Sequence, residues 1–516
     1  MAVIKKNIRM NKMKGKIISQ ITLDDDVNVS DRLPDIGHKI TETGEIIVDS
    51  VKASQNKIAI SGKLNFKIMY KAQAAEVDIH KLEGNMNFDE IINMEGIEDG
   101  DTISVDLSID DLSIDVINSR KISVKAVITV VAIAENISDE EFVVELEDSS
   151  IEYIKEPIEL TRLAVKKKDL LRVREEINLV SGKLNINEII WNTANLNKQQ
   201  IKLAENKVLV SGEIAVFILY SAEEGPLQWV DINVPFSGAI DVPGCSEEMI
   251  PQIELKLKGA EIEAKPDLDG EQRMFSLDGI VNVDIKLYEE HCFDVVKDAY
   301  SKSKDIILKD KKIDYEALLT KNITKGKVNE KFQINSLENV HIMQICSTVA
   351  DVKLDDTSLR PEGIMVEGVL DISVLYICSD DANPLRCMHE SIPFSQMIEI
   401  NDIKENSVFN IRGMLEQISA NMAGSDEIEI KGVILLDCTV FDKMRKNVVM
   451  DYEEKEYDME KIASMPGIVG YICKSGDTLW SIAKKFYTSV DCIKNINEIT
   501  DNPKEGQMLI IVKQMG

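Results

Sequence analysis

The chain has 516 residues, of which 44% are hydrophobic and 29% charged, values typical of globular protein with enough apolar residues to bury several cores. Its 60 basic and 90 acidic residues give a net charge of -30. A surface this acidic repels phosphate backbones, which argues against a nucleic-acid-binding protein. A basic partner or simple solubility explains the charge equally well.

Residues 1–20 contain six basic side chains and no apolar core of the kind found in a secretory signal. We expect them to form a solvated basic arm, with contact to an anionic membrane surface as the alternative. The longest uncharged apolar run, Ala126 to Ala134, is far shorter than a membrane span. The eight cysteines show no CxxC spacing, which favours reduced thiols and a cytoplasmic protein.

One pattern recurs three times along the chain, in "ISGKLNFKIMY", "VSGEIAVFILY" and "VEGVLDISVLY", which end at Tyr70, Tyr220 and Tyr376. Apolar residues occupy every second position, a period that predicts a β-strand with one buried face. A Phe follows each copy, at Phe88, Phe236 and Phe394. We expect three copies of one domain, in which the Gly of each strand marks a bulge or a close backbone approach.

Many short strands and few long helical patterns predict that each repeat is an all-β sandwich or barrel-like domain. In the second repeat the positions between the apolar ones are also apolar, at Ala215, Phe217 and Leu219. That strand should be covered on both sides, by a neighbouring repeat. The expected organisation is a basic arm (1–20), repeat 1 (21–150), a linker (151–172), repeat 2 (173–300), a linker (301–325), repeat 3 (326–452) and an acidic tether (453–467).

Residues 468–513 predict a separate β-α-α-β module. Leu479, Ile482, Ala483 and Phe486 have the spacing of one buried helix face, with Asp477 placed to cap the helix start. Thr488 and Asp491 have the spacing of a capping box for a second helix.

Three stretches of this module, "GDTLWSIA" from Gly476, Asn497 and "EGQMLII" from Glu505, closely resemble the LysM domain. The resemblance implies a shallow groove for N-acetylglucosamine-containing polymers between the loop after the first strand and the loop before the last. The groove residues would be Lys474, Ser475, Gly476, Asp477, Thr478, Thr500, Asp501, Asn502, Pro503 and Gly506.

Trp480 follows Leu479 by one position and therefore points about 100° away from it on the helix. We expect its side chain to be at least partly exposed. It is interpreted as a binding anchor beside the groove, because exposed Trp is enriched among binding hot spots. The alternative is that it covers the flank of a small core.

Three β-rich repeats followed by a LysM domain resemble the SipL/SpoVID type of spore coat morphogenetic protein, whose repeated unit is the SPOCS domain. The resemblance implies a scaffold in the mother-cell cytoplasm, at the forespore surface, that holds the coat basement-layer ATPase SpoIVA through its LysM domain. Other coat proteins would be further partners. The alternative is a protein that binds peptidoglycan or an N-acetylglucosamine-containing, lipid-linked precursor.

An enzyme is disfavoured, because the sequence has no GxSxG, P-loop or Rossmann fingerprint. The His and Cys pairs at 291–292 and 387–389 lack the further ligands that a metal site needs. We therefore expect no catalytic residue, no metal and no cofactor. Strand order, the partners of each repeat, the oligomeric state and retained sugar binding are left open by the sequence.

Overall fold

The computed structural model describes residues 3–73, 78–223, 225–334, 340–457 and 466–514. Each of the three repeats contains six antiparallel strands. Those of the first are β1 (Val3–Asn28), β2 (Ile36–Ser54), β3 (Lys57–Ala72), β4 (Ile79–Asn93), β5 (Thr102–Asn118) and β6 (Lys121–Leu146). Those of the second are β7 (Ile151–Asn178), β8 (Ile186–Ala204), β9 (Lys207–Ala222), β10 (Gln228–Asp241), β11 (Ile250–Pro266) and β12 (Gln272–Ser301). Those of the third are β13 (Asp305–Gln333), β14 (Ile342–Arg360), β15 (Gly363–Cys378), β16 (Leu385–Glu399), β17 (Val408–Met422) and β18 (Glu427–Lys455).

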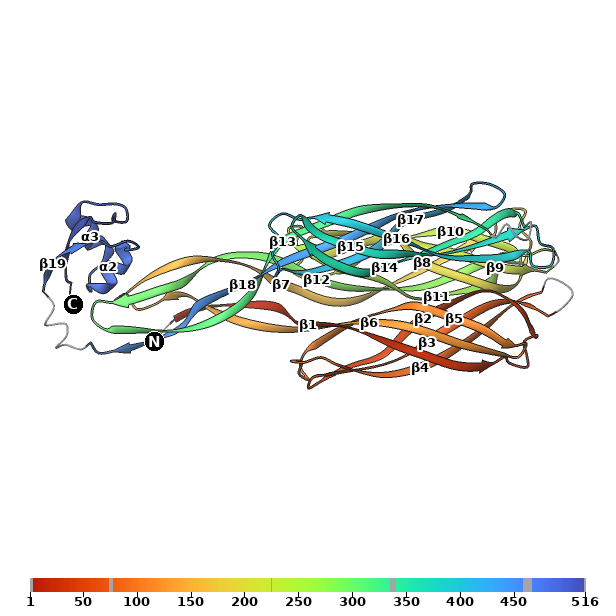
Figure 1. Cartoon of the computed structure of the whole chain (residues 1–516), viewed down its shortest axis with the longest axis horizontal. Coiled ribbons are helices and arrows are strands. Elements are labelled where there is room, and N and C mark those ends of the chain that lie inside the picture. Colours follow the sequence, from red (N-terminus) through yellow and green to blue (C-terminus); the bar gives the residue numbers. More distant parts are fainter. Residues whose placement is uncertain (1–2, 74–77, 224, 335–339, 458–465, 515–516) are drawn as a thin grey trace.

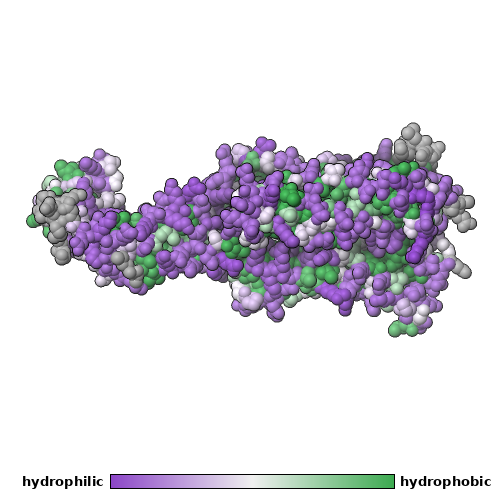
Figure 2. Space-filling model, turned by 90° about the horizontal axis from the view of Figure 1, so that it is seen from below, coloured by the Kyte–Doolittle hydropathy of each residue, from purple (hydrophilic) through white to green (hydrophobic). Residues whose placement is uncertain are grey.

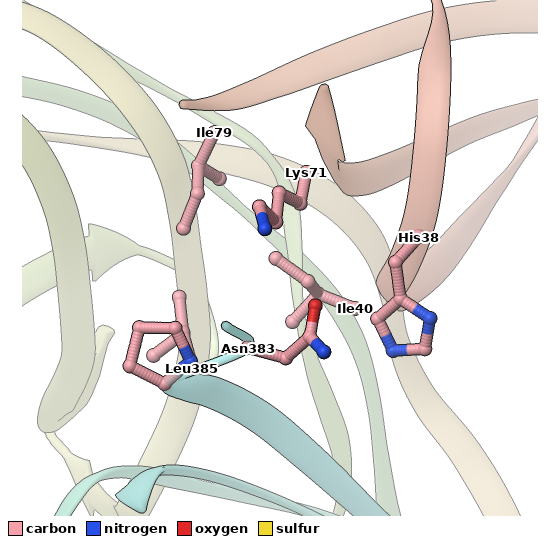
Figure 3. Close-up of a pocket in the computed structure, with 7 residues that line it drawn as sticks. His38, Ile40, Lys71, Ile79, Asn383 and Leu385 are labelled. Atoms are coloured by element: carbon pink, nitrogen blue, oxygen red, sulfur yellow. The ribbon is translucent and has the colours of Figure 1, made fainter. Parts of the chain in front are cut away.

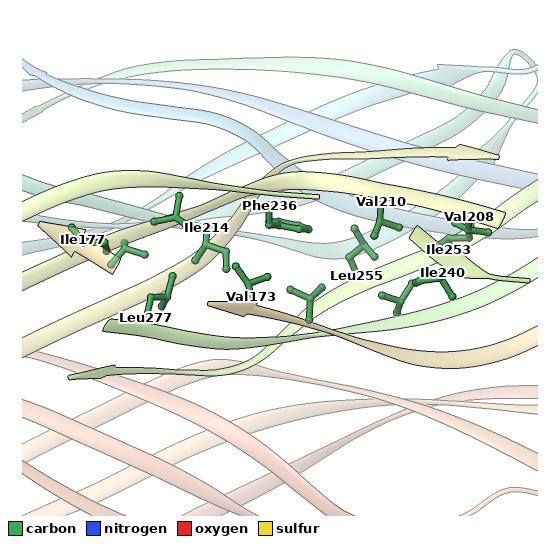
Figure 4. Packing of buried hydrophobic residues seen from close by; sticks show 14 of the residues in the cluster. Val173, Ile177, Val208, Val210, Ile214, Phe236, Ile240, Ile253, Leu255 and Leu277 are labelled. Atoms are coloured by element: carbon green, nitrogen blue, oxygen red, sulfur yellow. The ribbon is translucent and has the colours of Figure 1, made fainter. Parts of the chain in front are cut away.

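Every repeat is a β-sandwich of two three-stranded sheets with the same topology. In the first repeat the sheet orders are β1-β6-β5 and β2-β3-β4, and the other two repeats follow the same scheme. The core lies between the two sheets. In the second repeat, Val208 and Ile214 of β9 and Phe236 of β10 pack against Val173 of β7 and Leu277 of β12 (Figure 4). The prediction of mainly β repeats is confirmed, with the sandwich as the form they take.

The recurring Gly and Phe form one structural device. Gly62, Gly212 and Gly368 lie directly across the strand pair from Phe88, Phe236 and Phe394. A Cβ on Gly62 would lie 2.8 Å from the Phe88 ring and 2.5 Å from the Ile47 carbonyl oxygen. The neighbouring strand carries a bulge at this level, between Val48 and Ser50. The expectation of a bulge or a close backbone approach is confirmed, and both occur.

The expected arm and the two expected linkers are wrong. Residues 1–20 fall mostly in β1, residues 151–172 in β7 and residues 301–325 largely in β13, and each of these strands is paired along its length with the last strand of its repeat. The lysines of these segments face acidic residues instead of solvent alone. Lys12 Nζ lies 2.8 Å from Glu140 Oε1, and Lys167 Nζ lies 2.7 Å from Asp169 Oδ2. Of the expected tether (453–467), the structure describes residues 453–457 and 466–467, and residues 453–455 form the end of β18. The rest of the tether lies outside the described residues.

The first and last strands of each repeat are 26 to 30 residues long. Beyond the sandwiches they continue together as a narrower stalk, which is the part of the molecule nearest the C-terminal module (Figure 1). The stalk has a core to which all three repeats contribute. At its centre, Phe142, Val295 and Val448 occupy equivalent positions of β6, β12 and β18, and all three are buried.

A second shared cluster joins the sandwiches. Phe217 and Leu219 of β9 are buried against Met69 of β3 and Leu375 of β15. The second face of the β9 strand is thus covered by both neighbouring repeats, as its sequence predicted. The three repeats lie side by side around one axis (Figure 1), and they pack on each other at the stalk and at the sandwiches.

Buried ion pairs also connect the repeats. Glu135 of repeat 1 is 7% exposed and accepts hydrogen bonds from Lys286 Nζ at 2.6 Å and Lys166 Nζ at 3.3 Å, both from repeat 2. Burial raises the pKa of Glu135, but the charges and hydrogen bonds of Lys286, Asn11 and Lys166 outweigh burial and hold the pKa below its usual value. A carboxylate taken out of water is stable only with such partners. Glu135 therefore fixes how the first two repeats meet.

The face of the molecule seen in Figure 2 is mainly hydrophilic, with scattered apolar patches. A crevice between repeats 1 and 3 is lined by His38, Ile40, Lys71 and Ile79 on one side and by residues 383–385 on the other (Figure 3). Its interior volume of ≈ 10 Å³ is about that of one water molecule, which is too small for a ligand. Among the helices that the structure describes, none has the length and apolar composition needed to cross a membrane.

Candidate functional site: the LysM module at the end of the stalk

The C-terminal module contains β19 (Ile468–Ile472), α2 (Leu479–Lys485), α3 (Val490–Asn497) and β20 (Met508–Val512). The predicted β-α-α-β order is confirmed, but both predicted caps are wrong. Thr478, not Asp477, caps α2 in a capping box with Ser481, and Ser489 caps α3. Asp477 instead accepts hydrogen bonds from the backbone N–H of Lys474 and the hydroxyl of Tyr471, both at 2.8 Å. These bonds hold the pKa of Asp477 below its usual value.

The two loops predicted to bind ligand lie together. We call residues 474–478 and 500–506 the loop pair. The backbone N–H of Leu479 donates to Asn502 Oδ1 at 3.0 Å, and the N–H of Gly506 donates to the Cys473 carbonyl at 2.8 Å. Gly476 and Gly506 have φ values of +86° and +80°, which glycine adopts without steric cost. The chain turns sharply at both positions.

Most loop-pair side chains face solvent. The exposed members are Lys474, Ser475, Gly476, Thr478, Thr500, Asp501, Asn502, Lys504, Glu505 and Gly506, whereas Asp477 and Pro503 are half-buried. Hydroxyl, amide and carboxylate groups at this density can hydrogen-bond a sugar or a polar protein surface. Asn497 supports the site from behind: its Oδ1 accepts from the N–H of Ile510 at 2.7 Å, and its Nδ2 donates to the carbonyl of Ile510 at 2.8 Å. This explains the Asn of the motif.

Trp480 is half-buried, and its side chain is engaged by the stalk. Its Nε1 donates to Asp298 Oδ2 at 2.8 Å, and its ring packs edge-to-face on Tyr300 with the centroids 4.8 Å apart. The partial exposure expected from helix geometry is thus what the structure has. Its expected role as an anchor beside the groove stays a proposal. A partner that used Trp480 would have to displace Asp298 and Tyr300 from it.

Sequence reasoning missed Asp298 and Tyr300, because both lie in the segment just before the expected second linker. Tyr300 is 4% exposed and belongs to the same apolar cluster as Leu479 and Ile482 of the module. The signal was present: Tyr300 is an aromatic residue in an otherwise charged stretch, "VKDAYSKSKD".

The outer face of the two-stranded sheet is apolar and exposed. Ile468 and Ile472 of β19 and Met508 of β20 are 68%, 63% and 70% exposed. Ile472 and Met508 are directly paired, so these side chains form one strip. A hollow of about 90 Å³, lined by Pro466, Val469, Phe486, Ile511 and Lys513, lies on the other side of this sheet, because Val469 and Ile511 alternate with the strip residues along their strands. Strips of this kind on a polar surface are typical of protein–protein contact sites.

His389, from the His and Cys pair at 387–389, makes hydrogen bonds to two hydroxyl groups. His389 lies between Thr41 Oγ1 at 3.2 Å and Ser373 Oγ at 2.9 Å, and the partial desolvation of its ring by surrounding protein lowers its pKa. The Thr41 contact joins repeat 3 to repeat 1. Over the described ranges, no three His, Cys, Asp or Glu side chains are arranged to hold a metal ion.

Comparison with protein families matches the model described as "SipL, SPOCS domain" three times, over residues 35–117, 185–265 and 341–423. The LysM domain model matches residues 471–512. The chain belongs to the SipL/SpoVID type of SPOCS and LysM protein. Each SPOCS match runs from the second to the fifth strand of a repeat. The stalk strands lie largely outside the matches, although they complete every sandwich.

Both matched families are non-catalytic domain families, and the SPOCS repeats associate the chain with sporulation and the spore coat. The LysM domain associates it with glycan binding. No curated protein and no solved structure matches the chain.

Proposed function

We propose that the chain is a non-enzymatic scaffold for spore coat assembly, and that its LysM domain docks the coat ATPase SpoIVA. In this proposal it acts in the mother-cell cytoplasm at the forespore surface, and the stalk presents the LysM domain to the partner. The observation that carries the proposal is the exposed strip of Ile468, Ile472 and Met508 beside the loop pair. A protein partner buries such side chains, whereas a polysaccharide binds mainly through hydrogen bonds.

Three repeats packed on each other support a scaffold role, because a body with several separate surfaces can bind several partners at once. Linking weak sites in one body raises the overall affinity through effective concentration. The second candidate is binding of peptidoglycan or a lipid-linked N-acetylglucosamine precursor. It is favoured by the LysM match and by the polar, exposed loop pair.

Capture experiments with the purified full chain separate the two candidates. We expect immobilised chain to retain purified SpoIVA, and Ile472→Asp with Met508→Asp to weaken that capture at least tenfold, because both place a charge in the strip. Leu268→Asp is the matched control, since Leu268 is a fully exposed apolar residue on repeat 2.

The glycan candidate predicts a different pattern. Ser475→Glu with Thr500→Glu would then abolish retention of purified peptidoglycan, because both residues are exposed members of the loop pair. Retention of peptidoglycan together with no retention of SpoIVA by the wild-type chain would overturn the scaffold proposal.

Localisation gives an independent test. A fluorescent fusion should encircle the forespore in sporulating cells. A fusion found only at the outer cell envelope, or at full level in vegetative cells, would contradict this placement.

A further inference from the structure

The LysM module does not hang free from the stalk: a compact set of polar and aromatic contacts joins it to the end of β12. Asp298 accepts two hydrogen bonds from α2, one from Trp480 Nε1 at 2.8 Å and one from Lys484 Nζ at 2.5 Å. Two donors on one carboxylate, one of them charged, make a stronger contact than an ordinary neutral hydrogen bond. Trp480 and Lys484 are one helical turn apart, so Asp298 contacts both polar groups on this face of α2.

Tyr300 adds the apolar part of the contact. Its hydroxyl donates to the carbonyl of Thr488 at 2.7 Å, and its ring packs on Trp480. Tyr457, which follows β18 of repeat 3, donates to the Ser301 carbonyl and packs edge-to-face on Tyr487, with ring centroids 4.9 Å apart. The contact is thus built from β12, from the end of repeat 3 and from the module itself.

The pseudo-symmetry of the stalk shows that this docking site is specific to the second repeat. Each of the three last strands has a register shift at the same level, and the residue after it is acidic in every repeat: Glu145, Asp298 and Asp451. Two positions later the residues differ. They are Glu147, Tyr300 and Glu453. At these two positions, which lie on the same side of the strand, β12 alone of the three strands combines a carboxylate with an aromatic ring.

We propose that the tip of β12, Asp298 to Ser301, is an intramolecular latch that holds the LysM domain closed and masks the Trp480 and Lys484 face of α2. A partner that binds this face must supply a carboxylate and an aromatic group in place of those of Asp298 and Tyr300. The latch itself depends only on contacts within the chain. Its competition with a partner rests on the proposed function, with SpoIVA as that partner.

Hydrogen exchange on the full chain tests the latch without any partner. In Asp298→Asn and in Tyr300→Phe, amides of α2 and of residues 298–301 should exchange about tenfold faster than in wild type, because each change removes hydrogen bonds of the docked state. Asp451→Asn is the matched control. Asp298 and Asp451 each accept the N–H of the next residue, at 2.9 and 2.8 Å, and no contact of the described residues joins Asp451 to the LysM domain. Unchanged exchange in both latch variants, or an equal increase in the control, would overturn the latch.

Capture of purified SpoIVA then tests the masking. The Asp298→Asn chain should be half-saturated at a several-fold lower SpoIVA concentration than wild type, with Asp451→Asn unchanged. Faster exchange with unchanged or weaker capture would show that the docked face is not the one that the partner uses, and would overturn the proposal. Absence of capture by every chain, wild type included, would count against the proposed function and leave the latch to be decided by exchange.

Discussion

At the scale of single residues, the repeated Gly and Phe show how a sequence motif can be purely structural. The Phe ring lies over the glycine, and the bulge in the neighbouring strand brings a carbonyl oxygen to the space that a side chain would occupy. This packing explains why the Gly and Phe pair recurs in all three repeats, without any catalytic or ligand-binding role.

Gly62→Ala should lower the stability of the protein by about 1 to 3 kcal/mol, because its Cβ would overlap the Ile47 carbonyl, which belongs to the backbone and cannot move aside. The urea midpoint followed by circular dichroism measures the effect. Gly100→Ala serves as the control, since a Cβ there meets nothing within 4 Å. Equal midpoints for the two variants would contradict this account of the motif.

Glu316 of β13 is a half-buried carboxyl whose charge works against folding. Burial raises the pKa of Glu316 to about 7, despite the opposing charge of Lys443. The folded state therefore holds a proton that the unfolded chain releases above pH 4.5. The stability associated with the neutral carboxyl is complete below that pH and is lost as the pH rises through about 7.

Glu316→Gln should accordingly stabilise the protein at pH 8 by about 1 to 3 kcal/mol, because glutamine is neutral where the glutamate is charged. At pH 4 the stability should change little, because the folded wild-type carboxyl is neutral there as well. Denaturation at the two pH values tests this. Asp314→Asn, which breaks an exposed ion pair with Arg445, should change stability by less than about 0.5 kcal/mol. A Glu316→Gln variant less stable than wild type at pH 8 would show that the charged form is the favoured one.

At the scale of elements, the sequence predicted the strand that ends at each recurring Tyr. It missed the first strand of each repeat, because β1, β7 and β13 were expected to be largely an arm and two linkers. The strand ending at Tyr70 alternates apolar residues with polar ones from Leu64 to Ile68, so its period of two identifies it. β7 mixes buried residues such as Leu163 with a run of lysines, which reads as a solvated segment. In the structure Lys166 and Lys168 pair with Glu135 and Asp284, which are distant in sequence. A single strand cannot reveal partners of this kind.

The reassignment of β7 changes what a protease should do. Trypsin should spare the bonds after Lys166, Lys167 and Lys168 in the native protein, because the backbone there is paired with β12 and cleavage requires local unfolding. Mass spectrometry of early fragments measures this, with urea-unfolded chain as the control for intrinsic susceptibility. First cuts at these three lysines would restore the linker interpretation.

At the scale of the whole molecule, the repeats make one body and not a string of domains. The signal in the sequence was local, the two-faced apolar strand at Phe217 and Leu219, and it predicted a neighbour without identifying which repeats would supply it. The candidate site divides in the same way. The loop pair was found because its residues lie within one short module, whereas Asp298 and Tyr300 reach that module from about 180 residues away.

The packing of all three repeats on each other is the central structural claim, and Leu219→Ala tests it most directly. Leu219 is 1% exposed among residues of all three repeats, so its truncation should cost about 2 to 5 kcal/mol. Hydrogen exchange in low urea should then show equal loss of amide protection in β3, β9 and β15, since the three strands share one cluster. Loss of protection confined to β9, with β3 and β15 unchanged, would show that the repeats fold as independent domains and would contradict the account.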